Sequence, residues 1–215
     1  MATSIVDICN MALAKLGAKP IISLTDGSVQ ASLCNTIAQQ TVDEMLSEHL
    51  WNCAMFRQTL NKITYTNPLP DDVLQFAYPL PTNPYCLRVV DVAPYYTPYT
   101  IESLATAAYT GRVLLSSETA VAILYIGRQT DFSQLHPELV KAMVSRLKAE
   151  LSYPLLANPA LTKEFFVQAK DDLAMARSMD SQEGSPVRAD INDLVNIRLT
   201  SAVADDYNRN WRIAR

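Results

Sequence analysis

Four apolar stripes with helical spacing limit the folds that this sequence can adopt. The first two run through Ile5, Ile8, Cys9, Ala12, Leu13 and Leu16, and through Leu33, Ile37, Val42, Met45, Leu46 and Leu50. The other two run through Leu139, Met143, Leu147 and Leu151, and through Leu161, Phe165, Ala169, Leu173 and Ala176. Such spacing is typical of amphipathic helices. Because each helical hairpin can bury its stripes only against a neighbour, the pattern predicts a four-helix bundle.

Capping residues set the expected ends of the first two helices. Ser4 and Asp7 can form a capping box, and Gly17 is suited to end the first helix in a left-handed conformation. Ser28 is a plausible cap for the second helix, which we expect to continue through a run ending L-S-E-H-L-W-N-C-A-M-F-R-Q-T-L at residue 60. Residues 1–60 are therefore assigned to the bundle.

Prolines delimit the two later helices. Pro137 suits a first helical turn, and Tyr153-Pro154 is expected to break the third helix. Asn158 followed by Pro159 then provides a cap and a first-turn proline for the fourth helix, which should stop near residues 184–186. Residues 136–184 complete the bundle in this reading.

Residues 61–135 differ in composition and predict an inserted β-rich module. The strand candidates are residues 86–92, 99–102, 112–115 and 120–126, each rich in β-branched or aromatic residues. Prolines between them cannot occupy central strands, so long surface connections are expected. The fold class is thus mainly α, a four-helix bundle interrupted by a small antiparallel β domain, and the chain should leave and re-enter the bundle at adjacent points.

Residues 185–215 predict an extended C-terminal arm. Ile191, Leu194 and Val195 suggest a short helix within it. The candidate contact residues near its end are Tyr207, Arg209, Trp211, Arg212 and Arg215. Since Tyr, Trp and Arg are enriched at binding hot spots, the arm is interpreted as a docking segment. The alternative is a frayed terminus with incidental aromatic residues.

Several segments resemble the sequences of one protein family, and they occur in the same order along the chain. They are N-M-A-L-A-K-L-G-A (10–18), L-T-D-G-S (24–28), L-W-N-C-A-M-F-R (50–57), F-A-Y-P-L-P (76–81) with C-L-R-V-V-D-V (86–92), G-R-V-L-L (111–115), L-Y-I-G-R-Q-T-D-F (124–132), and the helix beginning H-P-E-L-V-K-A-M (136–143). Together they resemble the tail tubular protein A of short-tailed bacteriophages, a head-to-tail adaptor. The stretch 80–88 departs from the family pattern by an extra loop.

The resemblance implies a structural virion protein of the tail, assembled in the host cytoplasm. It implies a closed ring of twelve copies between the portal protein and the tail nozzle protein, through which genomic DNA passes during ejection without specific binding. The arm would then contact the portal or a neighbouring subunit. The β module would face the nozzle, with Tyr85, Tyr95, Tyr96 and Tyr99 as candidate contacts.

Charge and hydropathy restrict the other partners. The formal net charge of −4 argues against tight, sequence-independent DNA binding, which needs clustered cations to displace counterions from phosphates. The longest apolar run, near residues 121–126, is far shorter than a membrane span, and the first residues do not resemble a secretory signal. We expect a protein made in a reducing cytoplasm, without a membrane partner.

The residue types required for catalysis lack the necessary spacing. The five glycines form no phosphate-binding motif. Neither His49 nor His136 has a second His or Cys at the sequence spacing that is typical of a metal site. The four cysteines, Cys9, Cys34, Cys53 and Cys86, are expected to be buried free thiols. No cofactor, metal or enzymatic activity is therefore predicted. Two other readings stay open: a head-completion connector of a long-tailed phage, or a small cytoplasmic enzyme or regulatory helical domain.

Overall fold

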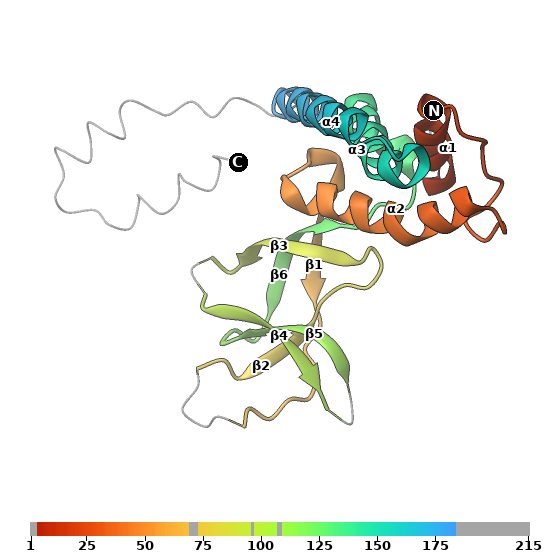
Figure 1. Ribbon diagram of the computed structural model, residues 1–215. Helices are drawn as coiled ribbons and strands as arrows, with labels where there is room; N and C mark the ends of the chain where they lie inside the picture. The colour runs from red at the N-terminus through yellow and green to blue at the C-terminus, as the bar shows by residue number, and fades with distance from the viewer. Residues whose placement is uncertain (1–3, 69–72, 96, 107–108, 184–215) are drawn as a thin grey trace, which may run out of the picture.

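The computed structural model describes residues 4–68, 73–95, 97–106 and 109–183, which form a helical bundle with a β module inserted between its second and third helices (Figure 1). The helices are α1 (Ile5–Lys15), α2 (Val29–Glu48), α3 (Pro137–Leu156) and α4 (Pro159–Asp180). The strands are β1 (Met55–Leu60), β2 (Phe76–Pro79), β3 (Cys86–Ala93), β4 (Tyr99–Ala105), β5 (Thr110–Ser116) and β6 (Val121–Gly127). The predicted fold class is confirmed for these residues. The arm, residues 185–215, lies outside them.

The helices begin where the capping residues predict. The Asp7 amide donates to the Ser4 hydroxyl (3.3 Å) and the Ser4 amide donates to the Asp7 carboxylate (3.0 Å), so the capping box is present. Ser28 accepts from the amide three residues on, at 3.2 Å, and Asn158 caps α4 in the same way. Gly17 has a φ of +71°, the left-handed conformation expected after α1.

Two helix ends differ from the prediction. α2 ends at Glu48, and Met55–Leu60 is strand β1 rather than the end of a helical run. Its pairing partner is β6, more than sixty residues away, and long-range pairing outweighs local helical spacing here. α3 continues through Pro154 to Leu156. Pro154 has no amide hydrogen for the carbonyl four residues before it, so one intrahelical hydrogen bond is lost, but only two helical residues follow before Ala157 leaves the helix at a φ of 51°.

The β module consists of two three-stranded antiparallel sheets, with strand orders β1-β6-β3 and β2-β5-β4. The four predicted strands are confirmed as β3, β4, β5 and β6. Strands β1 and β2 were not predicted from the sequence. Strand β2 lies at an edge of its sheet, and Pro79 is its last residue. Proline has no amide hydrogen to donate, and an edge strand tolerates this because only one of its sides pairs with another strand.

The described residues form three hydrophobic clusters. The largest fills the bundle and includes Ile126 from the end of β6. The second lies between the two sheets, where Val121, Ile123 and Tyr125 of the first sheet meet Tyr78 and Leu114 of the second. A small third cluster covers the remaining face of the second sheet around Ala77, Val113 and Leu115. Figure 1 shows α2 between the β module and the α3–α4 pair, so the first sheet is covered on both faces.

Candidate functional site

The chain crosses between bundle and β module at two adjacent points, as predicted. Strands β1 and β6 pair in antiparallel register, with Met55 opposite Ile126. Just beyond β6, the Gln129 side-chain amide donates to the Cys53 carbonyl at 3.0 Å. The two crossings thereby form one joint, in which residues 50–57 and 124–132 lie side by side although they are far apart in sequence.

Arg128 fastens this joint to α2. Its Nε donates to Oδ1 of Asp43 at 3.0 Å and its Nη2 bonds Oδ2, which makes a bidentate ion pair. The hydrogen bond to Asp43 raises the pKa of Arg128 above its ordinary value. The guanidinium also lies over the Tyr85 ring, 4.8 Å from the ring centre. A further bond, from Arg88 Nη1 to the Ser47 carbonyl (3.3 Å), joins β3 to the end of α2.

The C-terminal end of α4 is anchored beside the same joint by Asp180, a buried carboxylate. The Asn52 backbone amide donates to Asp180 Oδ1 at 2.9 Å, and the Asn52 side-chain amide donates to the Asp180 carbonyl at 2.9 Å. His49 Nε2 lies 3.4 Å from Asp180 Oδ2, and the His49 ring contacts Trp51 edge-on. The point at which the chain leaves α4 toward the arm is therefore held against the α2–β1 turn.

The four candidate tyrosines do not form one cluster. Tyr85 lies at the bundle end of β3, beneath Arg128. Tyr95 follows the far end of β3 and Tyr99 begins β4, and both side chains are exposed. Tyr96 lies outside the described residues, as do Tyr207, Arg209, Trp211, Arg212 and Arg215. The structure thus separates Tyr85 from Tyr95 and Tyr99 by the length of β3.

The cysteines are free, and Cys9, Cys34 and Cys86 are buried as expected, whereas Cys53 is half-buried. A hydrogen bond with Cys34, together with burial, raises the pKa of Cys9. Burial raises the pKa of Cys86 to about 11 and raises the pKa of Cys53 as well. Because the thiolate is the reactive form, these three side chains are poor nucleophiles at neutral pH.

The histidines act as local structural groups. Nδ1 of His136 accepts from the Glu138 amide at 3.2 Å at the start of α3, and His49 pairs with Asp180 as described above. Among the described residues, no group of three or more His, Cys, Asp or Glu side chains is placed to hold a metal ion. Within the same part of the chain, none of the helices has the length and apolar character needed to cross a membrane.

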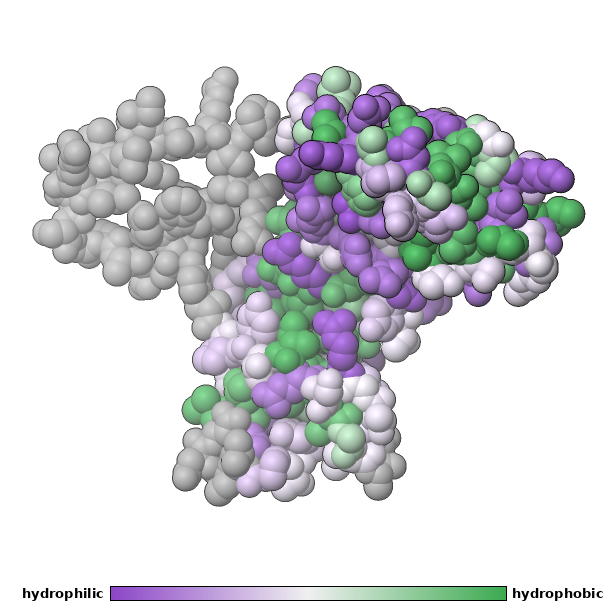
Figure 2. All heavy atoms as spheres, viewed as in Figure 1, coloured by the Kyte–Doolittle hydropathy of each residue, from purple (hydrophilic) through white to green (hydrophobic). Residues whose placement is uncertain are grey.

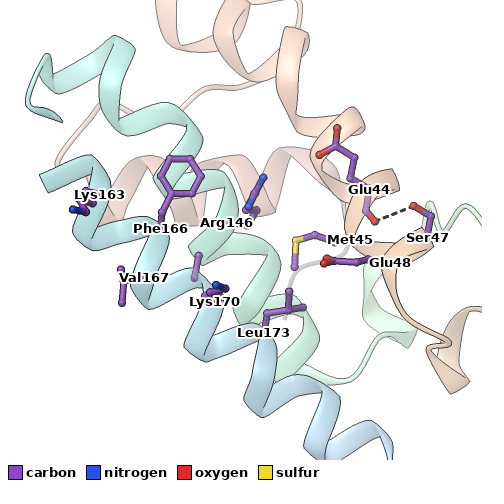
Figure 3. A pocket seen from close by; sticks show the side chains of 11 residues that line it. Glu44, Met45, Ser47, Glu48, Arg146, Lys163, Phe166, Val167, Lys170 and Leu173 are labelled. Carbon is purple, nitrogen blue, oxygen red and sulfur yellow. Dashed lines mark hydrogen bonds between the residues drawn. The ribbon is translucent and has the colours of Figure 1, made fainter. Parts of the chain in front are cut away.

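A groove of about 680 Å³ lies between α2 and α4. Figure 3 shows Met45 of α2 and Leu173 of α4 between the two helices, with Phe166, Lys163 and Lys170 farther along α4. Figure 2 shows apolar residues interspersed with hydrophilic ones over the visible face of the bundle. Sequence reasoning missed this groove, because its two helices are separated by the whole β module.

No protein-family model matches this chain, and curated protein sequences give no significant match to it.

Proposed function

We propose that this protein is the head-to-tail adaptor of a short-tailed bacteriophage, assembled as a ring of twelve copies between the portal and the tail nozzle. The function is assembly, and DNA passes through the ring without a covalent step. The proposal rests on the ordered sequence resemblance to the tail tubular protein A family.

One structural observation supports this reading. Several of the resembling segments fall on the helix caps and on the joint between bundle and β module, and the others fall on β2, β3, β5 and the start of α3. Segment 10–18 forms the second half of α1 with its glycine cap, and segment 24–28 leads to the Ser28 cap. Segments 50–57 and 124–132 form the two crossings between bundle and β module. A sequence that preserves these positions preserves the way in which the two parts are joined.

The two ends of the molecule suggest different partners. Asp180 fixes the exit of the arm at the side of the bundle, so we assign residues 185–215, with Tyr207 and Trp211, to the portal or a neighbouring subunit. The far end of the β module is assigned to the nozzle. Tyr95 and Tyr99 are the better candidates there, because they lie at the end of β3 away from the bundle, whereas Tyr85 precedes β3 at the bundle end, beside Arg128.

Light scattering coupled to size-exclusion chromatography tests the proposal. The purified chain is measured alone and after mixing with the portal protein encoded in the same genome. We expect a complex whose mass corresponds to one portal ring with twelve added chains, and ring-shaped particles in negative stain. Absence of any co-migrating complex, or particles with only two-fold symmetry, would overturn the proposal.

A further inference from the structure

We propose that strand β1 of one copy of this chain pairs in parallel with strand β4 of a second copy, and that this contact joins successive copies head to tail. The inference goes beyond the adaptor proposal, which assigns no strand of the β module to a neighbouring copy. The contact needs neither portal nor nozzle, so it can be tested on the chain alone.

Each three-stranded sheet has two edge strands, and two of these four are protected. β3 has two register shifts in its pairing with β6, and Arg88 bonds it to the Ser47 carbonyl of α2. β2 has four residues, ends at Pro79, and accepts the Ile63 amide at the Ala77 carbonyl (2.9 Å). By contrast, β1 and β4 contain neither proline nor lysine and have no register shift. Such unprotected edges are templates for pairing with another strand.

Alternate residues of β4 direct their backbone N–H and C=O groups to its open side. The Leu80 amide donates to the Arg112 carbonyl at 3.1 Å, so Arg112 faces β2 and the next residue of β5, Val113, faces β4. Val113 lies opposite Glu102, so Glu102 and every second residue from it bond to β5. The residues whose backbone groups point away from β5 are Tyr99, Ile101, Ser103 and Ala105.

The same alternation applies to β1. The Arg128 amide donates to the Tyr85 carbonyl at 2.8 Å, just before β3, so even-numbered residues of β6 face β3 and odd-numbered ones face β1. Tyr125 therefore bonds to Phe56, which lies opposite it. The residues of β1 with outward backbone groups are Met55, Arg57 and Thr59. Within the described residues, no backbone hydrogen bond from outside the two sheets reaches the outward groups of β1 or β4.

Charge indicates which of the two open edges pair. Arg57 of β1 and Glu102 of β4 are exposed, and neither forms an ion pair with another described residue. Antiparallel pairing of β4 with β4 of a second copy would place the two Glu102 carboxylates on the same face of the new sheet. Pairing β1 with β1 would do the same with the two Arg57 side chains. Like charges in neighbouring cross-strand positions are destabilising, so β1 with β4 is the favoured combination.

The outward backbone groups also determine the direction of pairing. In an antiparallel pair, Arg57 would lie opposite another outward residue such as Ile101, on the face away from Glu102. In a parallel pair, an outward residue lies opposite an inward one, so Arg57 can lie opposite Glu102. The Arg57 amide then donates to the Ile101 carbonyl, and the Arg57 carbonyl accepts from the Ser103 amide.

This register aligns residues 55–60 with residues 100–105 over the full length of β1. Phe56, which is half-buried, lies opposite Ile101, which is 36% exposed, so an aromatic ring covers an exposed β-branched side chain. Each copy that offers β1 to one neighbour keeps its own β4 free for another. The contact is therefore heterologous and repeats from copy to copy, which gives a ring if the rotation closes.

Carbodiimide crosslinking of the full-length Arg57→Lys variant tests the pairing. The reagent condenses a carboxylate with an amine in direct contact and takes up the water that is lost as a urea. We expect dimers and higher multiples on a denaturing gel, with Lys at position 57 joined to Glu102. Mixing isotope-labelled with unlabelled chains shows by mass spectrometry that the link joins two copies. Adding Glu102→Gln is the control and should remove this crosslinked peptide.

A charge exchange measures the same contact without a crosslinker. In sedimentation velocity, Arg57→Glu and Glu102→Arg should each raise the dissociation constant of self-association about three- to tenfold. An equal mixture of the two variant chains should restore the association, because each β1 then meets a β4 of opposite charge. Ser103→Pro removes an outward amide and should abolish association, whereas the matched control Ser103→Ala should leave it unchanged.

Several results would overturn the proposal. They are a wild-type chain that stays monomeric in both measurements, a crosslink from position 57 only to other carboxylates, and an Arg57→Glu variant that associates as wild type. If only Glu102→Arg weakened association, β4 would pair with itself. If Ser103→Pro failed to fold, the charge variants would still decide. Attachment to the portal is measured separately by co-migration, so failure here is distinguishable from failure of the adaptor proposal.

Discussion

At the scale of single residues, Trp51 is the side chain whose loss should cost the bundle most. It is 1% exposed, its Nε1 donates to the Met45 carbonyl at 2.8 Å, and its ring contacts His49. Trp51→Ala removes a large core side chain, so we expect the free energy of unfolding to fall by about 3 to 5 kcal/mol. Urea denaturation followed by circular dichroism at pH 7 measures this change.

Trp51→Phe provides the matched control. It retains most of the apolar ring but leaves the Met45 carbonyl without its donor, so a smaller loss of about 1 to 2 kcal/mol is expected. If Trp51→Ala left the melting midpoint unchanged, the packing role assigned to this ring would be wrong.

Asp172 gives the bundle a defined pH dependence. Burial acts to raise the pKa of Asp172, but hydrogen bonds from Ser145 (2.6 Å) and Lys141 (3.1 Å) outweigh it and hold the pKa below the ordinary value of 3.8. A carboxyl whose pKa is lower in the folded state stabilises the fold above its unfolded pKa, and this contribution is lost as the pH falls through the folded pKa. Wild type should therefore exceed Asp172→Asn in stability by a constant amount from pH 7 to 5.

That advantage should shrink below about pH 4. Denaturant midpoints of both proteins across the pH series measure it. Ser145→Ala is the companion variant, since removing the hydroxyl donor lets the pKa of Asp172 rise, and its acid-induced loss of stability should begin at higher pH. An advantage of wild type that stays constant down to pH 2 would contradict this assignment.

At the scale of elements, the ion pair between Arg128 and Asp43 holds the β module to α2. Asp43→Asn removes the negative charge from a bidentate, partly buried pair, so Arg128 keeps its contact with the Tyr85 ring but loses its ionic partner. We expect a loss of about 1 to 3 kcal/mol in unfolding free energy, with faster amide exchange in β3 and β6.

The control for this variant is Glu150→Gln. It disrupts the i,i+4 pair with Arg146 within α3, which is more exposed than the Arg128–Asp43 pair, and a change of at most about 0.5 kcal/mol is expected. Equal effects of the two variants, measured by denaturation and hydrogen exchange, would show that the joint contributes no more than an ordinary surface pair.

The elements that could be predicted from the sequence are those with local signals. Ser4, Ser28 and Asn158 mark helix starts because each cap bonds an amide two or three residues away. Strand β1 could not be predicted in this way, because its state depends on pairing with β6 across the whole insertion. The last turn of α3 was missed for a different reason: a proline near a helix end costs less than one in its middle.

The candidate sites show the same limit. Tyr85, Tyr95 and Tyr99 are candidates by residue type, but the sequence does not reveal that the Arg128 guanidinium lies over the Tyr85 ring or that the length of β3 separates Tyr85 from the other two. The groove depends on Met45 and Leu173, which lie on stripes interpreted simply as core. Only the packing of α2 beside α4 shows that residues of these stripes also line a surface groove.

At the scale of the whole molecule, the charge balance predicts how the protein behaves toward DNA. With a formal net charge of −4 it offers few cations to release counterions from phosphates. We expect the free chain to bind random duplex only weakly, with affinity falling steeply as salt rises. Fluorescence anisotropy with labelled duplex over a salt series measures this, and sub-micromolar binding at physiological salt would contradict it.

The last prediction separates folding from attachment. Residues 201–215 contain Tyr207, Trp211 and three arginines, and they follow the helical bundle in the sequence. Truncation after Thr200 removes only this terminal part, so the unfolding free energy should change by less than about 0.5 kcal/mol. Aromatic and arginine side chains dominate binding energy at many interfaces, and the truncated chain should therefore fail to attach to the portal protein.

Denaturation of the truncated chain and its co-migration with portal on size exclusion measure the two effects separately. Trp211→Ala in the full-length chain serves as the finer variant, and it should weaken attachment while leaving the melting midpoint unchanged. If the truncated chain still co-migrates with portal at full affinity, the contact lies elsewhere on the molecule. If it fails to fold, residues 201–215 belong to the core of the protein, and their assignment as a docking segment is wrong.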